Sequence, residues 1–435
     1  MYNLIAFVVF FLVSQNLFAL TLDIDTAKKM ALENNNIIKA YEEEAKSASY
    51  TLSQAKGGYF PKVSVSETFI STDEPATAAF SKMSQGKFDF TYFNTQLANP
   101  ERTENFETKI EIIQPVYMQG KIFFGIKQAK EMDKAYKLTL ERVKENILLN
   151  TVKAFYGKGV AEKAVEAVEK SLVRTKKYYE MTENFYKNGM IVKSDLLVAE
   201  SYLLQNEEAL ASAKKQVNIA ESHLQRLLNT DENIKIVWGD TNIVQIQDIE
   251  EYLAQAIQNR SDLKAMERFA KIKEYEVKKS KSEFLPEVAL FADYKMNDEN
   301  FLGDSGSGLT AGVMVKLNIF DGMSTVNKIK TNKSNYLSLI HKLNDKKLEI
   351  KTEVREAYYT YKASIERLNA MKKQVEAAYK ALEITENRFK EGLAKITELL
   401  DREFEVKEAE LKLAMAEYDV IVSKSELLFA TGKIK

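Results

Sequence analysis

The stretch "YKNGMIVKSDLLVAE", residues 186–200, decides the fold, because the chain repeats it as "FKEGLAKITELLDRE" at residues 389–403. In each copy a glycine precedes a Leu-Leu pair by seven residues, and the two copies are 203 residues apart without a gap. Gly189 and Gly392 suit the left-handed residue that commonly ends a helix. Each stretch therefore predicts a tight turn between two antiparallel helices.

The start of each returning helix is also marked. Ser194 and Thr397 hold equivalent positions, five residues after the two glycines. A hydroxyl side chain at the N-cap accepts a hydrogen bond from a backbone N–H that the helix leaves unpaired. We therefore predict Ser194 and Thr397 as N-caps, and Gly189 and Gly392 as the turn residues, of two hairpin tips.

Three further pairs of segments extend the duplication over nearly the whole chain: "ALENNNIIKA" from Ala31 with "AIQNRSDLKA" from Ala256, "YFPKVSV" from Tyr59 with "FLPEVAL" from Phe284, and "PVYMQG" from Pro115 with "NIFDGM" from Asn318. The offset is 225 for the first two pairs and 203 for the third, so the first copy holds 22 extra residues between them. We place these residues in a loop at about 71–104 and expect that loop to tolerate an insertion near Gly86.

The N-terminal apolar run, residues 4–13, is shorter than the about 20 residues that a membrane-spanning helix needs. It predicts a secretory signal peptide instead. The predicted divisions of the chain are the signal peptide (1–19), a first repeat (20–229, with a helix, a strand pair at about 61–117 and a hairpin tip near 189), a linker containing a strand (230–246), and a second repeat (247–435, with a helix, a strand pair at about 286–319 and a tip near 392).

Long helices are predicted between the strand pairs and the tips. Residues 116–285 contain no proline, and none occurs after residue 286, so nothing interrupts a helix there. Apolar residues recur at spacings of three, four and seven at Leu140, Val143, Ile147, Ala154, Ala161, Val168 and Leu172. This spacing is typical of helices that pack lengthwise. A helix from residue 120 to 188 would be about 100 Å long.

The segments around the prolines alternate instead, which predicts strands. On one face we expect polar side chains: Glu107, Lys109, Glu111, Asp293, Lys295 and Lys316. On the other face we expect apolar ones: Phe106, Ile110, Ile112, Val288, Leu290, Val313 and Val315. Strands of 9–11 residues are long enough to span a membrane, but the same pattern fits an amphipathic sheet in a soluble protein.

Composition excludes several classes of function. The net charge is −1, without the basic excess of a nucleic-acid-binding protein. No cysteine is present, so disulfides and thiolate metal sites are excluded. His223 and His341 stand alone, and we find no catalytic constellation. We therefore expect no enzymatic activity, no cofactor and no bound metal.

The duplicated segments and the two glycine tips, in the order in which they occur along the chain, resemble those of the TolC-type outer-membrane efflux proteins. Four strands cannot close a membrane barrel in one chain, and unpaired edges are costly in lipid. The resemblance implies a mainly α-helical chain with four transmembrane strands, whose homotrimer forms a 12-stranded β-barrel and an α-helical periplasmic tunnel. It implies a location in the Gram-negative outer membrane, with the 71–104 loop outside the cell and residues 230–246 at the tunnel's equator. In such a barrel we expect the six polar strand residues to face the water-filled lumen and the seven apolar ones to face lipid.

The resemblance also implies a function. The chain would be a passive exit duct of a tripartite efflux or type I secretion system, in contact with outer-membrane lipid. Its partners would be a periplasmic membrane-fusion adaptor and an inner-membrane pump of the RND, ABC or MFS type. The substrate stays open between a drug, a metal, a solvent and a secreted protein. The alternative is a soluble periplasmic coiled-coil scaffold.

The resemblance further places acidic residues at the periplasmic entrance. Glu398 and Asp401 lie six and nine residues after Gly392, and in the first copy only Asp195 corresponds. Three-residue spacing puts Glu398 and Asp401 on one helix face. If these residues form a gate, the carboxylates of three chains make a ring around the entrance, and this ring attracts cations. The simpler interpretation is that Asp195 and Glu398 complement a helix dipole, an effect of about 0.3–1 kcal/mol.

Overall fold

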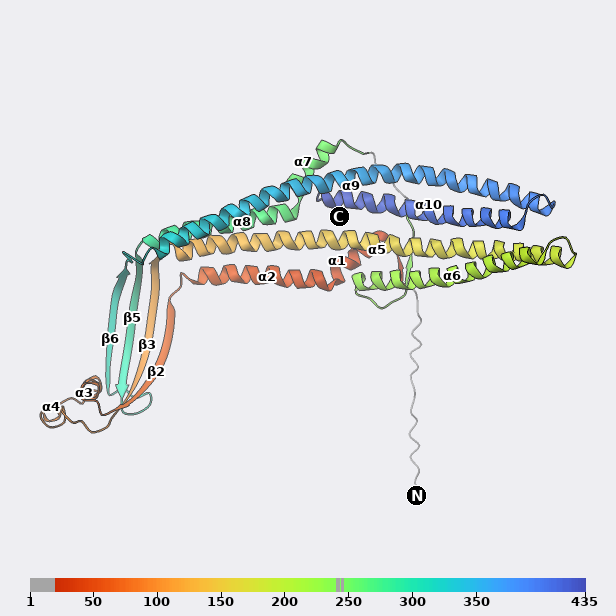
Figure 1. Cartoon of the computed structure of the whole chain (residues 1–435). Helices are drawn as coiled ribbons and strands as arrows, with labels where there is room; N and C mark the ends of the chain where they lie inside the picture. The colour runs from red at the N-terminus through yellow and green to blue at the C-terminus, as the bar shows by residue number, and fades with distance from the viewer. Residues whose placement is uncertain (1–19, 240–242, 244–245) are drawn as a thin grey trace, which may run out of the picture. The chain divides into compact units, whose positions relative to one another are not determined.

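The computed structural model describes residues 20–239, 243 and 246–435. The predicted signal peptide, 1–19, lies outside the described residues, as do parts of the predicted linker. The chain divides into two compact units. One comprises residues up to Glu42, Thr139–Leu263 and Asp345–Lys435, and the other comprises Glu43–Leu138 and Lys264–Asn344. Helices predominate, and the strands are few, as the sequence predicted (Figure 1).

The second unit carries the predicted sheet. Its strands are β2 (Lys62–Thr72), β3 (Thr103–Met118), β5 (Glu287–Asp298) and β6 (Gly306–Lys316), all antiparallel in the order β2-β3-β5-β6 (Figure 1). The register of β3 against β5 shifts between Pro115 and Tyr117, where proline has no N–H to donate to the ladder. Within the described residues, the outer edges of β2 and β6 pair with no other strand.

Short helices lie in the loop between β2 and β3. They are α3 (Pro75–Ser84) and α4 (Phe90–Thr95). The carboxylate of Glu74 accepts hydrogen bonds from the N–H groups of Ala76 and Thr77, and Pro75 occupies the first turn, so the start of α3 has a cap and a favoured residue. The strands are preceded by α2 (Asn36–Gly57), and by α8 (Ser261–Lys281) with the 3-10 turn η1 (Ser282–Phe284).

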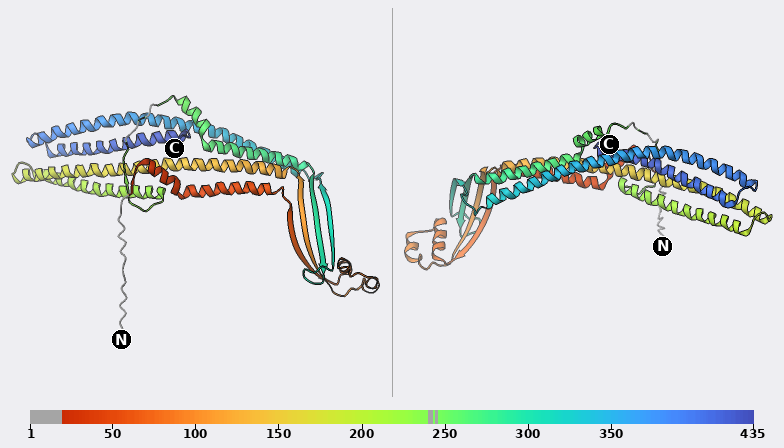
Figure 2. Two further views of the ribbon diagram at one scale, coloured as in Figure 1. Left: turned by 180° about the vertical axis from the view of Figure 1, so that it is seen from behind. Right: turned by 45° about the horizontal axis from the view of Figure 1, so that its top comes forward.

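The first unit is built on the helical hairpins. Their helices are α5 (Lys121–Lys187), α6 (Lys193–Leu228), α9 (Ser324–Lys390) and α10 (Ile396–Ala430). Figure 1 and both views of Figure 2 show α6 returning beside α5 and α10 returning beside α9. Helices α5 and α9 each contain 67 residues, which confirms the long helices that the apolar spacing predicted. Within the described part of the chain, no helix has both the length and the apolar character needed to cross a membrane.

Away from the tips, the first unit is completed by short elements. Helices α1 (Ile24–Asn34) and α7 (Ile249–Asn259) accompany a parallel pair of strands, β1 (Leu20–Leu22) and β4 (Ile234–Ile236). The strand predicted in the linker is therefore present, and its pairing with residues 20–22 was not predicted. Leu22 and Ile234 are buried with Phe155 of α5. Gly159 is required here, because a Cβ would lie 2.3 Å from the Trp238 ring.

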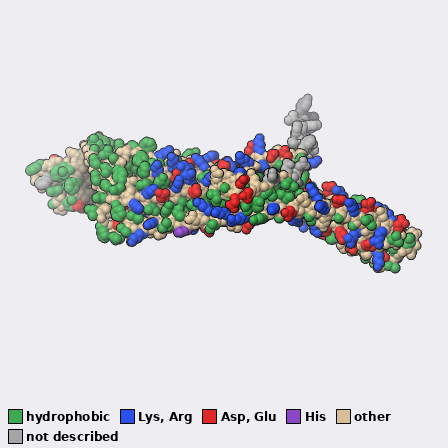
Figure 3. Space-filling model, turned by 90° about the horizontal axis from the view of Figure 1, so that it is seen from above, with side chains coloured by type: hydrophobic (Ala, Val, Ile, Leu, Met, Phe, Trp, Pro, Cys, Tyr) green, Lys and Arg blue, Asp and Glu red, His purple; other side chains and the backbone are tan. Residues whose placement is uncertain are grey.

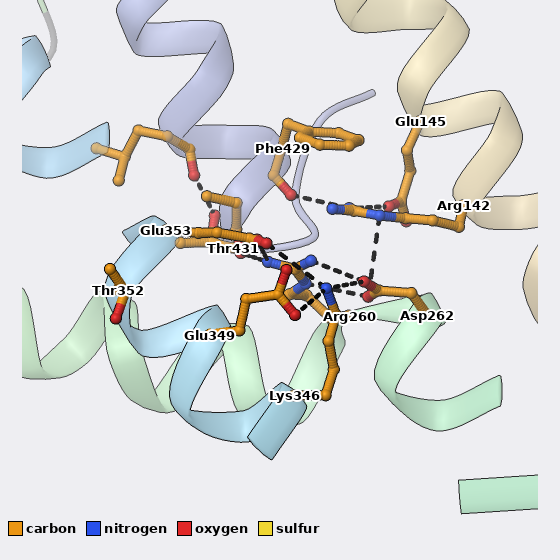
Figure 4. A network of polar contacts seen from close by, with 12 residues as sticks. Arg142, Glu145, Arg260, Asp262, Lys346, Glu349, Thr352, Glu353, Phe429 and Thr431 are labelled. Atoms are coloured by element: carbon orange, nitrogen blue, oxygen red, sulfur yellow. Dashed lines mark hydrogen bonds and ion pairs between the residues drawn. The ribbon is translucent and has the colours of Figure 1, made fainter. Parts of the chain in front are cut away.

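A buried charge network joins four helices of this unit (Figure 4). Arg260, only 1% exposed, donates to Asp262 at 2.7 Å and also pairs with Glu353 of α9. The guanidinium of Arg142 on α5 lies 3.6 Å from the Phe429 ring centre and donates to the Phe429 carbonyl at the end of α10. Burial alone would raise the pKa of Asp262, but the Arg260 hydrogen bond and the charges of Arg142, Arg260 and Lys346 together lower it. The network ties α5, α8, α9 and α10 together.

Candidate functional site

The two hairpin tips have the same backbone. Gly189 and Gly392 both have φ of +72°. Met190 N–H donates to the Phe185 carbonyl at 2.9 Å, and Leu393 N–H donates to the Arg388 carbonyl at 2.8 Å. This is the bond that closes a helix end around a left-handed glycine. The structure therefore places both glycines where a residue with a Cβ would be strained.

The N-cap predictions are wrong. Helix α6 has Val192 as its N-cap and α10 has Lys395, and neither side chain makes a capping hydrogen bond. The backbone is already extended at both residues, with ψ of 157° and 155°, so each helix begins two residues earlier than expected. Ser194 and Thr397 are consequently second helical residues, inside the first turn.

The predicted acidic residues all lie at the tips, but they have different environments. Asp195 and Glu398 lie in the first turns of α6 and α10. Glu398 accepts a hydrogen bond from Arg388 at 2.9 Å, and the same arginine donates to the Leu393 carbonyl at 3.1 Å. Asp401 accepts a hydrogen bond from the Tyr202 hydroxyl at 2.9 Å. Glu398 is thus neutralised within its own hairpin, whereas Asp401 links the two hairpins.

Sequence reasoning missed the partners of these acids. Tyr202 was not singled out, because its contact with Asp401 depends on packing between helices that are far apart in the sequence. Arg388 lies only ten residues before Glu398, on the other side of the turn, and the match between the two copies drew attention to the acids alone. The hydrogen bond to Asp401 raises the pKa of Tyr202. Slightly farther from the tip glycines, Arg174 of α5 donates a hydrogen bond to Glu403 of α10 at 2.6 Å. Burial raises the pKa of Glu403, which is only 2% exposed, so this pair is a buried contact between the two hairpins.

The sheet brings the six polar residues together on one face. Across β3 and β5, Lys109 lies opposite Lys295, Glu107 opposite Asn297, and Glu111 opposite Asp293. Lys316 of β6 has the same orientation by register, since Glu287 lies opposite it and Asp293 lies opposite Thr310. Lys109 Nζ is 2.5 Å from Glu111 Oε1, and Lys295 Nζ is 3.4 Å from Glu107 Oε2. The six polar residues therefore share one face of the sheet, and four of them form ion pairs on it.

The opposite face of the sheet is apolar and exposed. Val65 is 67% exposed and Val313 is 62% exposed. The register puts the other predicted apolar residues on this face as well: Phe106, Ile110, Ile112, Val288, Leu290 and Val315. On the molecular face in Figure 3, hydrophobic side chains gather over the sheet, toward the left. Such a contiguous exposed apolar surface marks a membrane or protein contact.

Some residues depart from this alternation: Ile70, Ile113, Phe291 and Met314 lie on the polar face by register, and one charge lies on the apolar face. Glu67 of β2 lies opposite Thr108, on the apolar face. The Thr108 hydroxyl donates to the Glu67 carboxylate, so this charge is hydrogen-bonded. The weak alternation of β2 was the available signal, but it did not identify this residue.

Comparison with known proteins assigns the class. The family model for outer membrane efflux proteins matches residues 28–230 and 252–433. The chain is 20% identical to the alkaline protease secretion protein AprF of Pseudomonas aeruginosa, over 71% of this chain and 65% of AprF. It is 23% identical to the outer membrane protein TolC of Vibrio cholerae, over 71% of this chain and 72% of that protein. The match to AprF thus spans less than two thirds of its length.

The fold agrees with this assignment. The crystal structure of the Campylobacter jejuni CmeC outer membrane channel superposes with a TM-score of 0.81 at 15% identity, covering 94% of this chain and 85% of that one. The chain therefore has the same fold as that channel. The chain belongs to the outer membrane efflux protein family. This membership confirms the predicted location in the Gram-negative outer membrane and does not favour a soluble scaffold. The family is one of transport proteins rather than enzymes.

Proposed function

We propose that the chain is one protomer of a trimeric exit duct that conducts substrates passively across the periplasm and outer membrane. The observation that carries the proposal is the antiparallel sheet with one polar face, one exposed apolar face and unpaired edges on β2 and β6. Unpaired strand edges cost several kcal/mol per group in lipid. Three copies supply twelve strands, enough to close a barrel with the polar face inward.

In this proposal the helical hairpins form the periplasmic tunnel, and their tips surround its entrance. Asp401 and Glu398 from three chains would place acidic groups around one opening, which favours cations. Arg388 reduces the contribution of Glu398, since the two are bonded at 2.9 Å. Asp401 is then the main acidic group, and its bond to Tyr202 ties the returning helices α6 and α10. Widening the entrance by separating these helices must break that bond.

The partners follow from the same proposal. A passive duct needs an energised inner-membrane pump of the RND, ABC or MFS type and a periplasmic membrane-fusion adaptor. AprF is named for secretion of a protease, and this supports type I secretion as one role. The family description names efflux, which supports a role in a tripartite efflux system. Neighbouring genes for a pump and an adaptor would separate the two.

The entrance is tested by conductance of the purified trimer in planar bilayers. The double change Glu398→Gln, Asp401→Asn should weaken cation preference and block by multivalent cations, because it removes the carboxylates from the opening. Asp195→Asn is the matched control at the other tip and should have the smaller effect. If selectivity and block stay unchanged while the trimer is intact, these residues only stabilise helix ends.

The orientation of the sheet is tested separately. Single cysteines can be placed freely, because the chain contains none. In membranes, a small polar thiol reagent should label Lys109→Cys rapidly and Ile110→Cys slowly, since only the polar face meets water. The reverse order of labelling would show that the barrel assignment is wrong.

A further inference from the structure

The 22 extra residues of the first repeat do not extend away from the sheet. A Cβ on Gly306 would lie 2.1 Å from the Ser84 carbonyl oxygen and 3.1 Å from the Gly86 nitrogen. Gly306 lies opposite Asn297, so its Cβ direction is that of the polar face, shared with Lys295 and Lys109. The segment at the end of α3 therefore packs on the polar face of the sheet.

Side-chain bonds hold the segment in that position. Gln85 is buried and donates to the Glu104 carbonyl at 2.7 Å and to the Asn105 side chain at 2.9 Å. Asn105 donates in turn to Asn297 of β5 at 2.9 Å. Asn105 and Asn297 share the polar face by register. The bonds thus continue the packing seen at Gly306 across two neighbouring strands.

Ion pairs add a second attachment. Lys82 Nζ lies 2.6 Å and Lys87 Nζ 2.9 Å from the carboxylate of Glu299, in the loop after β5. We define residues 73–102 as the cap. Since the cap is attached to both β3 and β5–β6, it is an ordered part of the sheet's outer end. Gly86, at φ of +68°, belongs to this attachment and is a poor place for the insertion that the sequence suggested.

The cap presents apolar side chains on the surface turned away from the sheet. Ala78 and Ser81 of α3 are buried, and the following Gln85 continues the same helix face. Phe80, which is 67% exposed, and Met83 lie on the opposite face. Phe90, at the start of α4, is also exposed. If the polar face of the sheet lines a lumen, these side chains point toward the lumen axis.

We propose that three caps meet on that axis and close the outer mouth of the duct, with Phe80, Met83 and Phe90 of each chain covered by the caps of two further copies of this chain. The inference rests on the trimeric duct proposed above. The exposed apolar side chains select the occupant, because inside a water-filled lumen the neighbouring caps are the nearest apolar surface. The interaction surface is therefore the contact of the cap with its own copies.

The dimensions of a closed barrel support this contact. Twelve strands at the usual spacing and tilt give a radius of about 12 Å. A helix with its side chains is about 10 Å across. The distance from the strands to the axis is thus about one helix diameter, so a cap attached at the outer end of the sheet reaches far enough to meet its two copies. A large substrate can leave only when the caps separate.

The chain offers a matched pair of glycines for the test. Gly306→Val introduces a side chain where the cap backbone lies, and should displace the cap. Gly308 lies two residues along the same face, and a Cβ there meets nothing within 4 Å. Gly308→Val should leave the cap in place. Both variants are made in full-length chains that carry Lys109→Cys and are expressed in intact cells.

Labelling from outside the cell is the readout. A membrane-impermeant maleimide on a polyethylene glycol chain should label Lys109→Cys on the order of tenfold faster with Gly306→Val than with the unaltered cap, because a constriction controls access to the lumen. Gly308→Val should leave the rate unchanged. Equal rates in all three backgrounds would overturn the cap proposal. If even a small polar reagent fails to label Lys109→Cys in any background, the lumen assignment fails, and the cap proposal with it.

A second readout does not disturb the cap anchors. Phe80→Cys in the otherwise cysteine-free chain should form disulfide-linked protomer pairs on mild oxidation, visible on a non-reducing gel. Val313→Cys, on the apolar face of β6, is the control and should not. Intact trimers without cross-linking at Phe80→Cys would show that the caps do not meet, even if Gly306→Val fails to fold.

Discussion

The two hairpin tips share one backbone and differ in chemistry. The turn glycines have the same φ, and the N-cap residues Val192 and Lys395 have nearly the same ψ. The side chains around them differ at equivalent positions: Phe185 against Arg388, Asp195 against Glu398, and Val198 against Asp401. The comparison shows that the glycine and the repeat determine the turn, whereas a few substitutions determine the charge at the tip.

The two hairpins also play different parts in the contacts between them. The first hairpin supplies Arg174 and Tyr202, and the second supplies the acids that they contact, Glu403 and Asp401. Within the repeat, Glu403 is equivalent to the exposed Glu200. The duplicated helices have thus become complementary, so that two copies of one structure bind each other by unlike side chains.

The largest expected effect comes from breaking the buried pair. Arg174→Met leaves the carboxylate of Glu403 without its partner, and removing one member of a buried pair costs about 3–5 kcal/mol. The free energy of opening α10 is measured by native-state hydrogen exchange on the purified trimer. Lys170→Met is the control, because Lys170 forms an exposed pair with Glu166; it should change the opening free energy by less than about 0.5 kcal/mol. An equal loss in both variants would contradict the buried-pair argument.

Acid should weaken the second hairpin through Glu386. Burial raises the pKa of this carboxyl, but hydrogen bonds from Lys177, Lys390 and Tyr178 outweigh burial and lower the pKa to about 2. A lowered pKa means that the stabilisation is complete above the ordinary value of 4.5 and is lost as the pH falls from 4.5 toward 2.

The expected loss is about 3 kcal/mol of opening free energy over that range. Glu386→Gln should flatten the acid dependence of the hydrogen exchange of α9. Glu183→Gln is the control at the equivalent position of the first hairpin, where the carboxylate bonds Lys187, and it should leave the acid dependence in place. If the hydrogen exchange of α9 has the same acid dependence in the unaltered protein and in both variants, other carboxylates cause that dependence.

The shared backbone predicts equal effects at the two glycines. Gly189→Ala and Gly392→Ala should each destabilise their tip by about 1–2 kcal/mol, because a Cβ is unfavourable in the left-handed region. Gly125→Ala, inside α5 with nothing within 4 Å of the new Cβ, should instead stabilise by about 0.5–1 kcal/mol. Heat dissociation of the trimer and tip hydrogen exchange measure both. A large difference between the two tips would show that side chains also determine the turn.

Local patterns carried most of the fold. Alternation predicted the strands and the faces of the side chains assigned from it, since the side-chain period of a strand is two. Helical spacing and missing prolines predicted α5 and α9. Glycine predicted both turns. The contact between Tyr202 and Asp401 could not be predicted, because the two residues are 199 residues apart and meet only through helix packing.

The packing of the cap and the first residues of α6 and α10 also could not be predicted from local sequence patterns. The length offset located the extra residues, but their packing depends on Gln85 reaching Asn105 and on the space above Gly306, which no local pattern encodes. The hydroxyl residues Ser194 and Thr397 have the right chemistry for N-caps. The extended backbone at Val192 and Lys395 begins the helices earlier, so chemistry alone misplaced the boundary by two residues.

The smallest expected effect tests that boundary at both tips. Ser194→Ala and Thr397→Ala should change tip stability by less than about 0.5 kcal/mol, since neither side chain is at an N-cap. Val192→Asp and Lys395→Asp should each stabilise by about 0.5–1 kcal/mol, because both N-caps now lack a side-chain hydrogen bond. Hydrogen exchange in the first turns of α6 and α10 gives the measurement. A loss of about 1 kcal/mol in Ser194→Ala, with no gain in Val192→Asp, would restore the hydroxyl residues as caps and move the helix starts back to the positions that the sequence suggested.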